Sequence, residues 1–258
     1  MQINDNIIIK QGDCLELMKD IPDKSIDMIL CDLPYGTTAC KWDTVIPFEI
    51  LWKEYERIIK NKCAIALFGS EPFSSYLRIS NIKLYKYDWI WIKSKASDFI
   101  NANCRPMKKH EIISIFSFGK SSPPVTDKNM KYFPQEIVYG EKKKIRKGSL
   151  GIGRDRDSQQ GEYISKGSNY PTSILSFSND GKTFHPTQKP VALLEYLIKT
   201  YTNENDLVLD NCAGSFSTAI ACINTGRRFI GYELDEKYFE FGKNRILDHL
   251  TKKEEMLF

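Results

Sequence analysis

Short apolar runs bounded by turn residues alternate along this 258-residue chain with segments that have helical periodicity. This alternation favours a mostly parallel β-sheet with helices packed on both of its faces. The predicted strands are residues 6–12, 26–31, 63–69, 87–93, 111–118, 206–212 and 228–233. The predicted helices are residues 13–20, 47–60, 71–80, 190–202, 217–225 and 235–250. We therefore predict an α/β, doubly wound, mostly parallel sheet of seven strands.

Two of the apolar runs follow one another without a helical pattern between them. They are Trp89–Ile92 and Ile112–Phe116. Consecutive strands without a helical connection pair most readily in the antiparallel sense. We therefore expect an antiparallel strand pair at the edge of the sheet.

An acidic turn follows the predicted strand at residues 26–31. It consists of Asp32, Leu33, Pro34 and Tyr35. A carboxylate and a backbone carbonyl here can each accept one N–H of an exocyclic amine, and the tyrosine ring can stack on a planar base. The proline has a fixed φ, which holds the spacing between the acid and the ring. Four residues are a weak signal alone, because acidic turns after strands are common and usually structural.

A turn of small residues follows the predicted strand at 206–212. The chain passes through Gly214 and enters a helix that begins near Ser217. Small residues allow the backbone to approach a ligand closely, and a helix N-terminus offers unpaired N–H groups to an anion. The next predicted strand ends in Glu233, where an acid can accept hydrogen bonds from ribose hydroxyls. These features indicate a nucleoside-containing cofactor without identifying it.

With these motifs in this order, the chain resembles S-adenosylmethionine-dependent amino-group DNA methyltransferases of the permuted beta class. In that family a catalytic Asp-Pro-Pro-Tyr-type motif comes first, a target-recognition insert second, and the cofactor loop last. The matching segments here are Asp32–Tyr35, residues 120–182, His185-Pro186-Thr187-Gln188-Lys189-Pro190 and Asp210–Thr218. The resemblance covers nearly the whole chain except the insert. The small size and the Asp-Leu-Pro-Tyr-Gly form are similar to enzymes of bacteriophages and mobile elements.

The resemblance implies one methyltransferase domain in two parts, residues 1–119 and 183–258, separated by a recognition insert at 120–182. It implies S-adenosylmethionine as cofactor and double-stranded DNA as partner. The implied catalytic residues are Asp32, Leu33, Pro34 and Tyr35. The implied cofactor-binding residues are Asp13, Cys14, Asp32, Thr187, Gln188, Lys189, Asp210, Cys212, Ala213, Gly214, Ser215, Phe216, Ser217, Thr218 and Glu233.

The implied reaction is transfer of a methyl group to the N6 amine of adenine, after base flipping, by direct in-line attack. The amine is a poor nucleophile because its lone pair is delocalised into the ring. Hydrogen bonds to Asp32 and the Leu33 carbonyl would draw the nitrogen toward tetrahedral geometry and free the lone pair. The protein then contributes alignment, desolvation and charge placement. The loop Thr37–Thr44 is expected to close over the flipped base.

Several implied site residues also have a simpler structural interpretation. Asp13 can be the N-cap of the helix that follows it, a role compatible with a cofactor contact. Lys189 can pair with a carboxylate or lie on the surface. Glu233 can bind ribose or form a surface salt bridge. His185 is expected to make a local structural hydrogen bond.

The chain departs from the family pattern at two positions. Phe216 stands where the family usually has glycine, and phenylalanine adopts a positive φ only at a cost. We therefore expect a negative φ at Phe216 with the ring turned outward. The alternatives are weaker cofactor binding or an inactive protein that still binds DNA. Leu33 replaces the first proline of the motif, which reduces rigidity but keeps the carbonyl.

Positive charge is concentrated in residues 120–182. Twelve Lys and Arg residues and seven Asp and Glu residues give this segment a net charge of +5, against +4 for the whole chain. The segment also loses apolar periodicity and gains Gly, Pro and Ser, as in a loop-rich inserted module. We expect it to contact nucleic acid; a merely solvated, lysine-rich loop is the alternative.

The remaining composition excludes several classes of protein. No run of eighteen apolar residues and no signal-peptide pattern occur, so we expect no membrane span and a cytoplasmic location. The seven cysteines include no Cys-x-x-Cys pair, which predicts reduced thiols and no metal site. Cys14, Cys31 and Cys212 fall at strand ends beside the expected cofactor, where alkylation would inhibit. A homodimer and a partner nuclease both stay open.

Other methyltransferase reactions are weighed by the residues they need. Carbon-5 cytosine methylation requires a thiolate, typically from a Pro-Cys pair, and this dipeptide is missing from the sequence. N4-cytosine methylation uses the same scaffold, more often with Ser in place of Asp32. Protein and RNA methyltransferases tend to carry Asn at that position and need no basic insert. Adenine is therefore preferred, with N4-cytosine as the alternative.

Overall fold

The computed structural model describes residues 1–36, 43–146, 161–178 and 188–255. The chain divides into two compact units. The larger unit contains Met1–Phe133 and Ser173–Phe258, and the smaller contains Pro134–Thr172. Each unit is described separately below.

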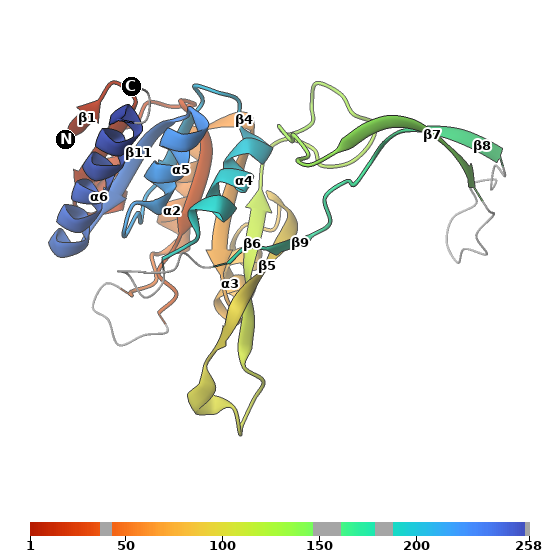
Figure 1. Ribbon diagram of the computed structural model, residues 1–258. Helices are drawn as coiled ribbons and strands as arrows, with labels where there is room; N and C mark the ends of the chain where they lie inside the picture. The colour runs from red at the N-terminus through yellow and green to blue at the C-terminus, as the bar shows by residue number, and fades with distance from the viewer. Residues whose placement is uncertain (37–42, 147–160, 179–187, 256–258) are drawn as a thin grey trace. The chain divides into compact units, whose positions relative to one another are not determined.

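The larger unit is built on a nine-stranded sheet. Its strands are β1 (Gln2–Asn4), β2 (Ile7–Gln11), β3 (Ile26–Asp32), β4 (Ile59–Gly69), β5 (Tyr85–Ser97), β6 (Lys108–Phe116), β9 (Ile174–Ser176), β10 (Leu207–Asp210) and β11 (Arg228–Glu233). Their order across the sheet is β1-β2-β11-β10-β3-β4-β6-β5-β9 (Figure 1). Neighbours from β2 to β4 are parallel, whereas β6 is antiparallel to both β4 and β5.

The predicted count of seven strands is wrong by two. Strands β1 and β9 are three residues long, too short to leave an apolar pattern in the sequence. β1 is antiparallel to β2, and β9 is parallel to β5 along Ile90–Ile92. The antiparallel pair β5–β6 exists as predicted, but β9 forms the edge of the sheet beside it.

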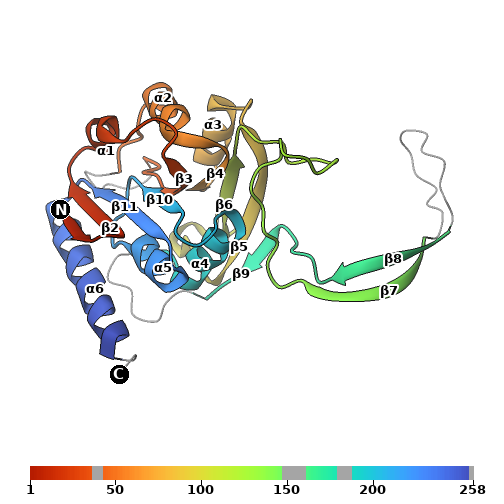
Figure 2. The same ribbon diagram turned by 90° about the horizontal axis from the view of Figure 1, so that it is seen from above.

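Helices cover both faces of the sheet, as the alternating pattern predicted (Figure 2). α1 (Cys14–Leu17) with the 3₁₀ turn η1 (Met18–Asp20), α2 (Phe48–Ile58) and α3 (Phe73–Ser80) lie on one face. α4 (Val191–Tyr201), α5 (Ser217–Thr225) and α6 (Glu236–Glu255) lie on the other. None of the helices in the described ranges is long and apolar enough to cross a membrane.

The spacing of apolar residues explains how these helices pack. In α2, Leu51, Trp52, Tyr55 and Ile58 are buried, and their spacing of three to four residues puts them on one side of the helix. The intervening residues include charged side chains that face solvent. This amphipathic stripe anchors α2 against the sheet and thereby supports the end of β3.

The parallel register brings distant residues to one edge of the sheet. β3 and β10 are neighbours, with Met28 paired to Val208. Both strands run in the same direction, so Asp32 and Asp210 end at the same edge despite their separation in sequence. In doubly wound folds this carboxyl edge is where ligands bind.

The segment predicted as an insert is divided between the two units. Residues 120–133 and 173–178 pack on the larger unit, where Met130 is 6% exposed and Phe133 N donates to Thr200 O at 2.7 Å. The smaller unit holds the antiparallel pair β7 (Val138–Arg146) and β8 (Gly161–Ser168). A recognition role for residues 120–182 stays a prediction.

Candidate active site

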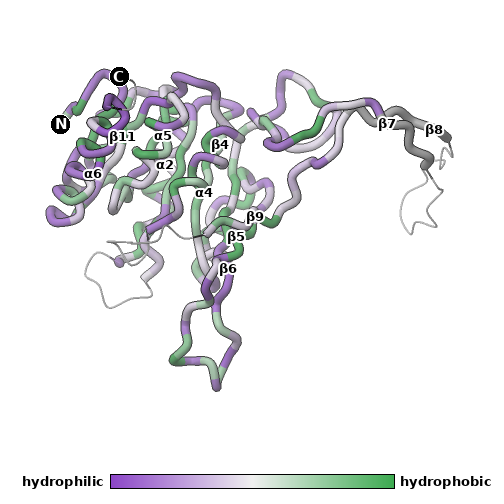
Figure 3. Tube along the Cα trace, in the orientation of Figure 1, coloured by the Kyte–Doolittle hydropathy of each residue, from purple (hydrophilic) through white to green (hydrophobic). Residues whose placement is uncertain are grey.

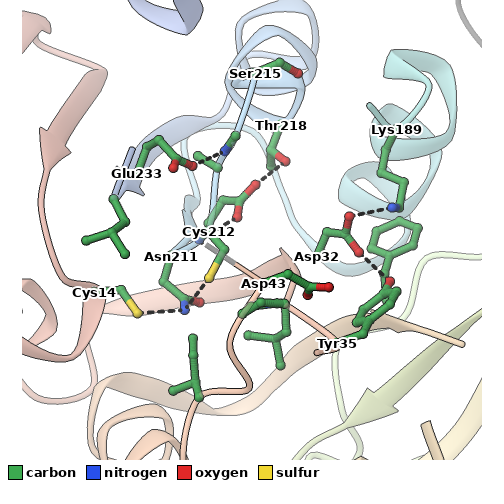
Figure 4. Close-up of a pocket in the computed structure, with 18 of the residues that line it drawn as sticks. Cys14, Asp32, Tyr35, Asp43, Lys189, Asn211, Cys212, Ser215, Thr218 and Glu233 are labelled. Carbon is green, nitrogen blue, oxygen red and sulfur yellow. Dashed lines mark hydrogen bonds and ion pairs between the residues drawn. The ribbon is translucent and has the colours of Figure 1, made fainter. Parts of the chain in front are cut away.

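A cavity of about 630 Å³ opens at the carboxyl edge of the parallel strands. The acidic turn after β3 and the small-residue turn after β10 both line it (Figure 4). All predicted site residues lie in its wall except Phe216, which does not, and Thr187, which is outside the described residues. The two motifs recognised separately in the sequence therefore share one cavity.

Asp32 is held at the end of β3 by two donors. Tyr35 Oη donates to Asp32 Oδ1 at 2.5 Å, and Lys189 Nζ donates to Asp32 Oδ2 at 2.5 Å (Figure 4). The side chain of Asp32 keeps 25% of its surface exposed, so the carboxylate faces the cavity. Its position is thus defined by one neutral and one charged hydrogen bond.

Lys189 joins two acidic residues from different strands. Its side chain is 8% exposed, and Nζ lies 3.2 Å from Glu111 Oε2 as well as bonding to Asp32. Nζ also lies 5.2 Å from the centre of the Phe68 ring, within range of a cation–π contact. The surface alternative for Lys189 is wrong, and its carboxylate partners are residues of the protein.

Glu111 and Lys93 complete an alternating row of charges that the sequence interpretation missed. Lys93 Nζ lies 3.2 Å from Glu111 Oε1, so the row runs Asp32, Lys189, Glu111, Lys93. Glu111 lies on β6 and Lys93 on β5, and both line the cavity. Each is a charged residue at the end of an apolar run, which is the same signal that singled out Asp32.

Burial and neighbouring charge act in opposite directions on this row. Burial raises the pKa of Asp32, and Lys189 opposes that shift. Burial would lower the pKa of Lys189, but Asp32 and Glu111 raise it above its usual range. Burial would raise the pKa of Glu111, but Lys189 and Lys93 hold it below its ordinary value. Lys189 therefore stays protonated and stabilises the ionised form of both carboxylates.

Tyr35 is fixed by packing and by its hydroxyl. Its ring lies 4.9 Å from the ring of Phe73, measured between centroids. Burial raises the pKa of Tyr35 well above its usual value, and Asp32 adds to the shift, so the hydroxyl stays protonated and donates. Gly36 then turns the chain at φ +68°, and its N–H donates to Asp43 Oδ1 at 2.9 Å. The predicted closing loop lies outside the described residues from position 37 to 42.

Asp210 occupies the neighbouring strand end with different partners. Thr218 Oγ1 donates to Asp210 Oδ2 at 2.6 Å, and Cys212 N donates to Asp210 Oδ1 at 3.2 Å. The residue is 4% exposed, and no described Lys or Arg forms an ion pair with it. Burial raises the pKa of Asp210 to about 7.

Glu233 braces the turn of small residues. Gly214 N donates to Glu233 Oε2 at 2.7 Å (Figure 4), and Asp235 N donates to Glu233 Oε1 at 2.8 Å. Burial raises the pKa of Glu233, whose exposed fraction is 8%. The surface salt bridge considered from the sequence is wrong for the described residues. A carboxylate offers about four lone-pair sites, so Glu233 keeps acceptor capacity for a ligand.

Phe216 differs from its prediction in both backbone and side chain. Its φ is +57°, in the left-handed region, and not negative as expected. Its ring is turned inward and is 0% exposed, next to Phe229 and Phe239 at centroid distances of 6.3 and 6.0 Å. A Cβ on Gly242 would lie 2.2 Å from the ring, so a glycine on α6 makes the space that the ring fills. Core packing thus outweighs the backbone strain at this position.

Asn211 is a further residue that the sequence interpretation missed. Its Oδ1 accepts from Tyr55 Oη at 2.5 Å, and its Nδ2 donates to the Sγ atoms of Cys14 and Cys212 at 3.6 and 3.5 Å. These contacts tie α1, α2 and the turn after β10 together beneath the cavity. Of the three cysteines expected to react, Cys212 is partly exposed, whereas Cys14 and Cys31 are buried.

Asp13 has the structural role predicted for it. Its Oδ1 accepts from Leu15 N at 2.8 Å, which makes it the N-cap of α1. Asp13 also lines the cavity, so the capping role leaves it available to a ligand.

A comparison with known proteins places this geometry in context. A family model described as DNA methylase, for the N6 and N4 types, matches residues 26–244. The chain is 45% identical over 244 residues to YubD of Escherichia coli (strain K12), covering 92% of this chain and 88% of that protein. It is 27% identical over 258 residues to DNA adenine methyltransferase YhdJ of the same organism, covering 94% and 83%.

Solved structures share the fold at lower identity. M1.HpyAVI in complex with SAM superposes with a TM-score of 0.60 at 24% identity, covering 93% of this chain and 98% of that one. PvuII DNA methyltransferase, described as cytosine-N4-specific, superposes with a TM-score of 0.66 at 16% identity, covering 96% and 93%. At these identities the likeness concerns the arrangement of helices and strands.

Proposed function

This chain belongs to the N6/N4 DNA methylase family, and we propose that it methylates the N6 amine of adenine at a specific site in double-stranded DNA. The methyl donor is S-adenosylmethionine, and the target base is flipped into the cavity beside Asp32. The catalytic turn on β3 precedes the cofactor turn on β10 along the chain, as in the permuted beta class. The bacteriophage or mobile-element type is part of the same proposal.

The observation that carries the proposal is the shared cavity. One wall presents Asp32 and Tyr35, and another presents Glu233 and the Gly214 turn. Its volume of about 630 Å³ lies within the range of small-molecule sites, roughly 300–1,000 Å³. A planar amine-bearing base and a nucleoside cofactor can therefore meet there.

The cofactor end fits S-adenosylmethionine by its donor and acceptor set. Glu233 would accept from ribose hydroxyls, and Asp13 would contact the adenine ring. The backbone from Cys212 to Ser217 lines the cavity with small side chains, which permits close approach of a ligand. When bound, the cofactor supplies an electrophilic methyl group on a sulfonium.

At the base end, the residues activate the amine by accepting its two N–H groups. Asp32 and the Leu33 carbonyl each take one, which draws the nitrogen toward tetrahedral geometry. Each oxygen of Asp32 has two lone pairs, so the carboxylate can bind the amine without losing its bond to Lys189. Tyr35 stacks on the base and fixes its plane.

Lys189 keeps Asp32 in the form that the reaction needs. A protonated Asp32 would have an O–H donor in place of one acceptor site and would lose its negative charge, and burial favours that form. The ammonium group at 2.5 Å counters this tendency. The amine nitrogen becomes positive as it gains the methyl group, and its surplus proton then passes to Asp32.

Adenine is the base that this site favours. The acid at position 32 offers a full negative charge to the exocyclic amine, whereas N4-cytosine enzymes more often have Ser there. The likeness to the cytosine-N4-specific PvuII enzyme keeps N4-cytosine as the second candidate. An inactive, DNA-binding protein is the third, since Phe216 departs from the family pattern.

Sequencing that detects modified bases tests the proposal directly. DNA from a host that lacks endogenous methylation and expresses this chain should contain N6-methyladenine at one sequence motif. The same host expressing Asp32→Ala supplies the background. N4-methylcytosine at the motif would select the second candidate, and unmodified DNA from a folded, expressed protein would refute the activity.

A further inference from the structure

Strands β5 and β6 continue beyond the sheet that holds them. β4 pairs with β6 only as far as Ile112, and β9 pairs with β5 only as far as Ile92. Past these points the two strands pair only with each other and end in the 3₁₀ turn η2 (Phe99–Asn101), as Figure 1 shows. Residues 93–110 are called the β5–β6 arm below.

The tip of the arm is ordered by its own hydrogen bonds. Asp98 has φ +73°, and its carboxylate accepts from Asn101 Nδ2 at 2.6 Å and from Arg105 Nε at 3.0 Å. Cys104 N donates to Asn101 O at 2.8 Å. A charged clamp thus holds the turn in one conformation without help from the core.

This ordered tip presents two apolar side chains to solvent. Phe99 is 79% exposed and Ile100 is 92% exposed. Figure 3 shows a hydrophobic stretch close to the end of the arm, next to a hydrophilic one. The Asp98 carboxylate is bonded within the tip, whereas these two large apolar side chains are open to contact with a partner.

The arm is strongly basic. It contains five Lys and Arg residues and a single acid, Asp98, which gives a net charge of +4 over residues 93–110. The whole chain carries +4, so the arm accounts for as much positive excess as the entire protein. Lys95 and Lys109 are exposed along its strands. A polyanion is the partner that matches this charge.

The base of the arm forms part of the active-site wall. Lys93, Ser97, Lys108 and His110 line the cavity. A strand advances about 3.3 Å per residue, so the four steps from Lys93 to Ser97, where β5 ends, span about 13 Å. That length exceeds the major-groove width of about 12 Å. A partner held by the arm therefore lies beside the cavity.

We propose that the β5–β6 arm binds the target duplex next to the flipped base, with Phe99 and Ile100 as an apolar wedge. Phenylalanine and isoleucine are among the side chains that proteins insert between base steps to open a duplex. Lys95 and Lys109 contact phosphates on the flanks. The proposal rests on the proposed function, because it takes DNA as the substrate. A second copy of this chain is a poorer occupant, since two arms of +4 repel each other.

A double substitution at the tip tests the wedge. Phe99→Ala with Ile100→Ala should weaken binding to a 40-base-pair unmodified duplex by about ten- to a hundred-fold, since contact with one base is worth a comparable factor. Ile79→Ala with Ile82→Ala is the matched control, because it removes two side chains that are 72% and 62% exposed elsewhere on the larger unit. The control should bind as wild type. Fluorescence anisotropy measures both.

Two further measurements distinguish the loss of a DNA contact from misfolding of the tip variant. The tip variant should keep the wild-type melting temperature and cofactor dissociation constant, because its side chains touch neither the core nor the cavity. Lys95→Gln with Lys109→Gln should lower the salt dependence of binding by about two counterions. The proposal would be overturned if the tip variant bound the duplex with wild-type affinity. It would also be overturned if sedimentation showed that the substitutions abolish only the formation of a protein dimer.

Crosslinking locates the tip independently of affinity. Cys104 is an exposed thiol beside the wedge. Benzophenone maleimide on Cys104 should crosslink the 40-base-pair duplex on irradiation, and this crosslink should be lost in the matched Cys104→Ser variant, where other cysteines can still be labelled. No crosslink from a protein that binds the duplex would contradict the placement.

Failure of this proposal is distinguishable from failure of the proposed function. If wild type methylates sheared chromosomal DNA and the tip variant does so equally well, only the arm proposal fails. If wild type binds DNA through the tip but leaves it unmodified, the arm stands and the activity fails. If wild type does not bind DNA, both fail.

Discussion

Two carboxylates stand at neighbouring strand ends of the same cavity, and their surroundings are opposite. Asp32 is bonded by the ammonium group of Lys189 at 2.5 Å. Asp210 accepts hydrogen bonds from the Thr218 hydroxyl and the Cys212 backbone N–H, and no described Lys or Arg forms an ion pair with it. Burial raises the pKa of both groups, but only Asp32 has a cation that opposes the shift. The difference shows that position in the fold does not set the charge of an acid; its partner does.

The contrast extends to what supports each end of the cavity. The Asp32 end is a row of four alternating charges from β3, β5, β6 and the segment just before α4. The Asp210 end has no such row among the described residues: Gly214 N donates to Glu233, Arg245 Nη1 donates to Ser215 O, and the Phe216 ring fills the core behind the turn. Substitutions at the first end should change activity and its pH dependence. Substitutions at the second should change stability.

The largest effect is expected from Asp32→Ala. Loss of the acceptor for the amine should reduce methyl transfer by about 10³-fold or more, the scale of removing a principal electrostatic contact. Cofactor binding should change little, because Glu233 and the Gly214 turn are untouched. Radiolabelled transfer and calorimetry measure the two quantities. Retained activity would remove Asp32 from the mechanism.

The next effect is on stability, at the other end. Phe216→Gly should lower the free energy of unfolding by about 3 kcal/mol, because the cavity left by a buried ring outweighs relief of the positive φ. Cofactor affinity should stay near wild type, since the ring does not line the cavity. Gly242→Ala should also destabilise, because its Cβ would meet the Phe216 ring at 2.2 Å. In a variant that combines Phe216→Gly with Gly242→Ala, the destabilisation caused by Gly242→Ala should largely disappear. Urea unfolding of the two single variants and the combined variant measures this.

Lys189→Met should give a smaller, pH-dependent loss. Without the cation the pKa of Asp32 rises further, so the acidic limb of the activity profile should move to higher pH. At neutral pH we expect a decrease of about 10- to 100-fold. Lys189→Arg is the matched control because it keeps the positive charge. Its acidic limb of the activity profile should lie at the wild-type pH. A uniform loss at every pH would indicate a purely structural role.

The smallest effect is expected from Asp210→Asn. The pKa of Asp210 is raised by folding to about 7, so the unfolded chain binds fewer protons between pH 4 and pH 7. Stability from this group is therefore present at low pH and is lost as pH rises through that window. Between pH 5 and pH 7, the free energy of unfolding of Asp210→Asn should therefore decline by about 2 kcal/mol less than that of the wild type. Identical pH dependence in both proteins, by thermal unfolding, would show that Asp210 does not titrate there.

Much of the fold was predictable from local pattern. The apolar run at 26–31 and the turn after it are consecutive in sequence, so one strand and its acid could be recognised together. The strands β1 and β9 could not be recognised from the sequence. A strand of three residues is too short to show periodicity, and its pairing depends on the neighbouring strands in the fold. Helix faces followed from spacing, as in Trp52 and Tyr55 of α2.

The motifs of the site could be predicted from the sequence, but the contacts between residues of different motifs could not. Asp32 and Lys189 each belong to a recognisable motif, but their contact arises from strand order. Glu111 and Asn211 belong to no motif, and their partners come from other elements of the fold. Phe216 was misjudged because its conformation depends on a glycine in α6, which no local pattern connects with it.

The order of the strands has a consequence for how the protein is made. β2 and β3 come early along the chain, yet β10 and β11 lie between them in the sheet and are synthesised long after them. A growing polypeptide on the ribosome therefore carries β3 with an open edge, which invites wrong pairing until residue 233 has emerged. Slower translation at low temperature should improve the soluble yield, because the wall of the cavity that contains Glu233 is synthesised long after the wall that contains Asp32.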